Sequence, residues 1–135
     1  MMPPVVFAVG DQVIRDCPST PNCVCSLASR EAQRILPLRL STPDAKLIEK
    51  VASALNSMPG TRVECQTDYY LHVTFRTRWL GFVDDVEFIM DAPRNLVHLR
   101  SASRLGYSDL GVNRRRMNSI TELLSSQIPA LQSIE

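Results

Sequence analysis

Four consecutive strand-like segments, separated by short turns, constrain the fold of this chain more than any other feature. They span residues 61–67, 69–79, 82–90 and 96–104. Apolar and polar residues tend to alternate along them, and this period of two is typical of strands with one buried face. The sequence therefore predicts a four-stranded antiparallel β-meander.

Amphipathic helical patterns flank the four segments. Before them, Thr42 is a candidate N-cap and Pro43 a candidate first helical residue, and an apolar stripe continues to about residue 57. After them, Asn113 is a candidate cap for a second helix with an apolar side of Met117, Ile120, Leu124, Ile128 and Leu131. Both stripes can cover the same face of the sheet. The predicted fold class is α+β, a meander with two helices packed on one face.

Residues 1–40 show no sustained period and are rich in Pro, Ser and Arg. We expect them to form an irregular N-terminal arm that wraps an α+β domain of residues 41–135. A chain of 135 residues is long enough to bury one core without a metal or a disulfide.

The composition argues against nucleic-acid-binding and membrane-spanning proteins. With 44% hydrophobic residues, 21% charged residues and a net charge of +1, the chain has no broad basic field, even around the arginines of residues 114–116. The apolar run of residues 3–9 is far shorter than the roughly 20 residues of a membrane span, and it lacks the basic leader of a signal peptide. We expect a soluble chain with no transmembrane segment and no nucleic-acid partner. Whether a leader has been removed stays open.

The third strand-like segment carries two adjacent aspartates, Asp84 and Asp85, which must point to opposite faces of the sheet. A two-residue hairpin loop at Leu80–Gly81 would set the register of the second and third segments. The expected cross-strand pairs are Trp79 with Phe82, Phe75 with Val86, Val73 with Phe88, Met90 with Val97, Phe88 with Leu99 and Glu87 with Arg100.

This register gives the two aspartates different surroundings. Asp85 lies beside Arg76 in a ladder of alternating charge on the outer face, which needs no function. Asp84 lies on the helix-covered face beside Thr77 and Ser103. Because a buried carboxylate costs several kcal/mol unless it is hydrogen-bonded or paired, we expect Asp84 to bind nearby hydroxyls, backbone amides or an arginine, with residues 100–116 as the candidate source.

A polar cleft is therefore predicted between the last strand and the second helix. Its candidate ligand-binding residues are Asp84, Ser101, Ser103, Arg104, Tyr107, Asp109, Asn113 and Arg114. The same residues could serve an enzyme in which a carboxylate is the general base and arginines hold an anionic substrate. They could also form a satisfied structural network with no ligand. The residues alone do not decide among these alternatives.

The cysteines and histidines add little catalytic signal. The spacing of the four cysteines lacks the two ligand pairs of a zinc site, and His72 and His98 are expected at the surface, so we predict no metal and no cofactor. A disulfide between Cys17 and Cys23 is sterically reasonable, but it depends on the redox compartment.

Three ordered motifs in this chain resemble the bacterial and plastid family catalogued as domain of unknown function 1499. They are "CPSTPNCVCS" (17–26), "YYLHVTFRTRWLGFVDDVEFIMD" (69–91) and "VHLRSASRLGYSDLGVNRRRM" (97–117), and the resemblance covers about residues 17–125. The family pattern falls on Cys17, Pro18, Pro21, Asn22, Cys23, Gly81, Phe82, Asp84, Asp85, Glu87, Arg100, Ser101, Ser103, Arg104, Gly106, Tyr107, Asp109, Gly111, Asn113 and Arg114. Cys25 departs from it, since serine is expected there.

The resemblance implies no activity. It implies an association with the bacterial envelope or the chloroplast, and that location would suit a Cys17–Cys23 disulfide. The leading hypothesis is a non-enzymatic binding or interaction module with a polar cleft for a small anionic or polar ligand or a partner segment. The alternatives are a small hydrolase-like or isomerase-like enzyme, and a purely structural network.

Overall fold

The predicted meander forms the centre of a larger sheet in the computed structural model, which describes residues 2–77, 81–105 and 111–133. Its strands are β5 (Thr61–Gln66), β6 (Tyr70–Arg76), β7 (Val83–Asp91) and β8 (Leu96–Ser103). A short 3₁₀ helix, η2 (Ala92–Arg94), connects β7 to β8. These four strands pair antiparallel in chain order, as expected.

The expected four-stranded sheet is too small, because three further strands extend it to seven. β8 pairs on its other side with β3 (Cys23–Cys25) and β4 (Leu38–Leu40), and β4 pairs with the C-terminal β9 (Leu131–Ser133). Each added strand has three residues, which is too short for a period of two to stand out.

The N-terminal segment is also more regular than expected. It contains β3, β4, a separate antiparallel hairpin of β1 (Val5–Val9) and β2 (Gln12–Arg15), and a 3₁₀ helix, η1 (Glu31–Gln33). Side chains of this segment, including Ile14 and Cys25, pack with Tyr70 and Ile89 on the outer face of the sheet. The arm therefore builds a second, smaller core.

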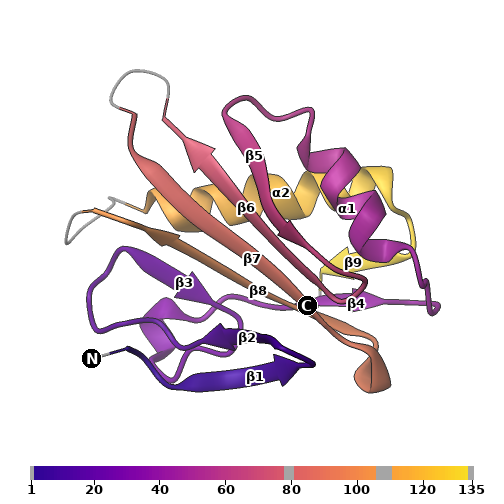
Figure 1. Ribbon diagram of the computed structural model, residues 1–135, viewed down its shortest axis with the longest axis horizontal. Helices are drawn as coiled ribbons and strands as arrows, with labels where there is room; N and C mark the ends of the chain where they lie inside the picture. The colour runs from indigo at the N-terminus through magenta and orange to yellow at the C-terminus, as the bar shows by residue number, and fades with distance from the viewer. Residues whose placement is uncertain (1, 78–80, 106–110, 134–135) are drawn as a thin grey trace.

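The main core lies on the opposite face, between the sheet and the two helices. Helix α1 (Leu47–Leu55) and helix α2 (Val112–Gln127) contribute their apolar stripes to it, and α2 runs behind the strands in Figure 1. Its fully buried side chains include Phe88, Leu99, Val51 and Ile120. Within the described residues, no helix is long and apolar enough to cross a membrane.

Both helices begin elsewhere than predicted. Helix α1 begins at Leu47 rather than residue 43, because Asp44 binds the Lys46 amide (2.9 Å) and the Lys50 ammonium (2.6 Å) in a turn outside the helix. Helix α2 begins at Val112 after Gly111. Asn113 is thus a buried helical residue rather than a cap, and Leu131 belongs to β9 rather than to the helix.

The register of β6 on β7 differs from the prediction by two residues. Val73, not Phe75, lies opposite Val86, and Phe75 lies opposite Asp84. The described ends of this hairpin agree with the shift, since Thr77 and Phe82 bond to each other. The expected pairing of Trp79 falls outside the described residues.

An even shift leaves the side chains of β6 and β7 on their predicted faces, so the predicted division between core and outer face is unaffected by the error. The second hairpin has the predicted register, with Phe88 opposite Leu99 and Glu87 opposite Arg100.

Candidate functional site

Asp84 lies on the helix-covered face as expected, opposite Ser103 and 3% exposed. Its partner is an arginine from the segment that follows, as expected, but it is Arg116 of α2 rather than Arg104 or Arg114, the arginines named among the candidate site residues. The Arg116 guanidinium also lies over the Phe75 ring, 5.2 Å from its centroid. Asp84 therefore neutralises the charge of a largely buried arginine. This role is structural.

Asn113 ties three elements together from the buried side of α2. Its Nδ2 donates to Ser103 Oγ (2.8 Å) and to the Asn22 carbonyl (3.2 Å), while its Oδ1 accepts from Ser101 Oγ. Asn113 and Ser101 have no exposed surface. Ser101, Ser103 and Asn113, three of the predicted ligand-binding residues, therefore fasten α2 to β8 and to the residue before β3.

Arg104 is on the outer face rather than in the predicted cleft. It binds Asp85 with both Nε (2.9 Å) and Nη2 (3.0 Å), and His72 Nε2 lies 2.7 Å from the same carboxylate. Burial raises the pKa of Asp85, but the bonds from Arg104 and His72 outweigh it and hold that pKa below its usual value. Asp85 belongs to an outer-face charge cluster, although Arg76 is not its partner.

His98 is not at the surface as predicted. It is buried on the outer face beneath the arm, where Nδ1 lies 3.3 Å from Ser26 Oγ and the ring lies beside Phe7. Burial lowers the pKa of His98, which favours the neutral imidazole. Tyr107 and Asp109, two of the predicted site residues, lie outside the described residues.

Arg114 lies apart from the other described residues of the predicted site, and it lines a cavity of about 190 Å³. Around this space lie the residues before and within β3, the 3₁₀ helix η1 and the start of α2. The described lining residues are Pro21, Cys23, Val24, Ala32, Gln33, Gly111 and Arg114. We refer to this space as the η1–α2 cavity.

The Arg114 side chain is held by backbone carbonyls of η1 and of the residue after it. Nη2 donates to the Ala32 carbonyl (2.9 Å) and Nη1 to the Arg34 carbonyl at 3.4 Å. None of the ion pairs among the described residues includes Arg114. Arg114, a cation that no described carboxylate pairs with, thus lies at the positive end of a 16-residue helix.

Gln33 contributes a buried amide to the wall of the same cavity. Its Nε2 donates to the carbonyls of Pro18 and Thr20, each at 2.8 Å. Its Oε1 is buried and has no hydrogen-bond partner among the described residues. Most buried side-chain acceptors in proteins have a partner, so this oxygen lacks one that a water or a ligand could supply.

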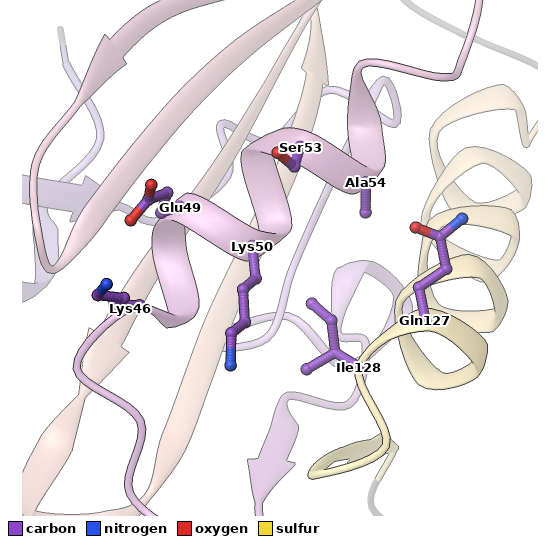
Figure 2. Close-up of a pocket in the computed structure, with 7 residues that line it drawn as sticks. All are labelled: Lys46, Glu49, Lys50, Ser53, Ala54, Gln127 and Ile128. Atoms are coloured by element: carbon purple, nitrogen blue, oxygen red, sulfur yellow. The ribbon is translucent and has the colours of Figure 1, made fainter.

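A larger depression between α1 and the end of α2, about 410 Å³, contains none of the predicted site residues. Figure 2 shows Lys50 extending away from α1, with Ile128 beside it on the chain that follows α2. Lys50 is already paired with Asp44 at 2.6 Å, and the depression is open to solvent. It presents no buried polar group that lacks a partner.

Cys17 and Cys23 are joined by a disulfide, with their Cα atoms 5.6 Å apart. Cys25 is buried, and burial raises the pKa of its thiol. The described residues contain no group of three side chains suited to hold a metal ion. The disulfide fixes the loop before β3, which forms one wall of the η1–α2 cavity.

Sequence reasoning missed Gln33 and Arg116. Gln33 lies in a stretch without periodicity, and nothing in its neighbourhood distinguishes it. Arg116 could have been found, because it lies three residues after Asn113 and four before Ile120, a spacing that places all three on one helix face.

Comparisons with known proteins identify one family. No curated protein and no solved structure matched the chain. A family model described as "Protein of unknown function (DUF1499)" matches residues 13–124, which include β3, η1, the meander and most of α2. The chain therefore belongs to the DUF1499 family.

Proposed function

We propose that the protein is a non-enzymatic binding domain that holds a small anionic ligand in the η1–α2 cavity. The observation that carries this proposal is Arg114, a cation at the cavity with no carboxylate partner among the residues that the structure describes. A guanidinium has five N–H donors, and the two bonds to carbonyls leave the others for an anion.

The start of α2 also favours a negatively charged ligand. Gly111 lies in the cavity wall and provides no side-chain cap for the helix that follows. The first amides of a helix and its macrodipole favour a negative group placed there. Arg114 and the helix start therefore act on the same side of the cavity.

The lining residues favour binding over catalysis. The described walls contain no histidine and no carboxylate, and Cys23 is in the disulfide. The described lining residues therefore supply no general base. Asp84, the base of the enzymatic alternative, is buried against Arg116 and outside the described lining of the cavity.

The proposed place of action is an oxidising compartment, such as the envelope or plastid locations that the family resemblance implies. The Cys17–Cys23 disulfide supports it, because disulfides are rare in proteins of reducing compartments.

A thermal-shift screen of small anions tests the proposal. We expect at least one anion to raise the melting temperature of the wild type but not of Arg114→Gln. Arg62→Gln is the matched control, since it removes the same charge from an exposed side chain on β5.

The variant Asp84→Asn distinguishes a ligand site at the η1–α2 cavity from the cleft around Asp84 that the sequence predicts. It should lower the melting temperature but retain the shift produced by the anion. Loss of the shift in Asp84→Asn or in Arg62→Gln, with retention in Arg114→Gln, would overturn the proposed site.

A further inference from the structure

We infer that the ligand of the η1–α2 cavity is an oxyanion that carries its own hydrogen-bond donor, as a 2-hydroxy carboxylate or hydrogenphosphate does. This inference rests on the proposed function and names its ligand class. It depends on Gln33 rather than on Arg114.

The orientation of the Gln33 amide is fixed by its neighbours. The Pro18 and Thr20 carbonyls only accept hydrogen bonds, so the nitrogen of the amide must face them. The oxygen must then face the other way. Gln33 is 6% exposed, and Oε1 has no partner among the described residues.

An acceptor in this state requires a donor. Leaving a buried carbonyl oxygen without a partner is unfavourable, and a donor brought by a ligand removes that penalty. A simple anion, such as acetate, has no donor to offer. A ligand hydroxyl or a protonated phosphate oxygen can donate to Oε1, while the charged oxygens remain for Arg114.

Gln33 and Arg114 both belong to the wall of one small cavity. The guanidinium of Arg114 binds the carbonyls of Ala32 and Arg34, the residues on either side of Gln33, and both side chains line the same cavity. Its volume of about 190 Å³ corresponds to about six water molecules at roughly 30 Å³ each. The cavity is therefore large enough for a compact oxyanion.

The test compares ligands rather than Gln33 variants, because substituting Gln33 would also remove its bonds to Pro18 and Thr20. Glycolate and acetate form one pair of probes, and phosphate and sulfate form another at neutral pH. Each is titrated by calorimetry into the wild type, Arg114→Gln and the control Arg62→Gln.

We expect the donor-bearing member of at least one pair to bind about tenfold more tightly than its partner, the change expected for one buried hydrogen bond. A preference for glycolate over acetate identifies a hydroxy acid, and a preference for phosphate over sulfate identifies a phosphate. Either preference should disappear in Arg114→Gln.

The two claims fail in different ways. Equal binding within both pairs, lost in Arg114→Gln, would overturn the inference about the donor and leave the anion site standing. Absence of binding for all four probes at tens of millimolar would overturn the proposed function, and the inference with it.

Discussion

At the scale of single residues, the buried charge of Asp84 is neutralised by Arg116. The two side chains are 4% and 13% exposed, so each compensates the other in a poorly solvated place. Replacing Asp84 by Asn should lower the free energy of unfolding by about 3 kcal/mol, because it leaves the arginine without its counter-charge. Urea denaturation of the wild type and the variant measures this difference.

A double variant is the control for this pair. Asp84→Leu combined with Arg116→Met removes both charges and should be more stable than Asp84→Asn alone. If the double variant is the less stable of the two, the ion pair does not explain the cost.

Asp85 on the outer face should make stability depend on acidity. Its folded pKa lies below the usual value, so its bonds to Arg104 and His72 contribute stability above the unfolded pKa. That contribution should disappear as the pH falls through the lowered folded pKa, that is, below about 4. Unfolding free energies of wild type and Asp85→Asn across this range should converge at the acidic end. Parallel curves would contradict the assignment.

The inward position of Asp84 could be predicted because strand alternation fixes the face of a side chain even when the register slips by two. The identity of its partner was missed, although the spacing carried it, because Asn113 was assigned as a cap and the face of α2 was therefore not counted from it. Once Asn113 is counted as a buried helical residue, the helical spacing places Arg116 on the same helix face as Asn113, toward Asp84. The same spacing places Arg114 on a different face.

At the scale of elements, Asn113 should be the main fastening of α2 to the sheet. Asn113→Ala removes its bonds to Asn22, Ser101 and Ser103, and we expect a loss of about 2 kcal/mol in unfolding free energy. Hydrogen exchange should quicken at β3 and at the start of α2. Asn118→Ala, an exposed position on the same helix, is the matched control and should leave exchange unchanged.

The disulfide should hold the loop before β3. Under denaturing, non-reducing conditions, the intact chain should be lighter by two hydrogens than after reduction. Replacing both Cys17 and Cys23 by Ser should cost about 2 kcal/mol of stability, as expected for a short closed loop. An identical mass before and after reduction would show that the two thiols are free.

The length of each element decided whether it could be predicted. β6, β7 and β8 each have at least seven residues, and the alternation in them is plain. β3, β4 and β9 have three each, and their pairing depends on partners far along the chain. For this reason the seven-stranded sheet and the cavity beside β3 had no local signal.

At the scale of the whole molecule, our proposal assigns structural support and ligand binding to different parts of the fold. The helix-covered face carries the core and the paired charges of Asp84 and Arg116, while the outer face is partly covered by the N-terminal arm. Between β3, η1 and α2, the same arm leaves a cavity with Arg114 and Gln33 in its wall. The polar residues expected to form one cleft therefore divide between fastening the fold and, in our proposal, binding a ligand.

Chemical-shift mapping tests this division most directly. In ¹⁵N–¹H correlation spectra of the wild type titrated with phosphate and with glycolate, the account predicts that the largest shifts occur at Ala32, Gln33 and Gly111. The same residues should not respond in Arg114→Gln. Shifts centred instead on the His72–Asp85–Arg104 cluster, or on Lys46 and Lys50 beside α1, would contradict it.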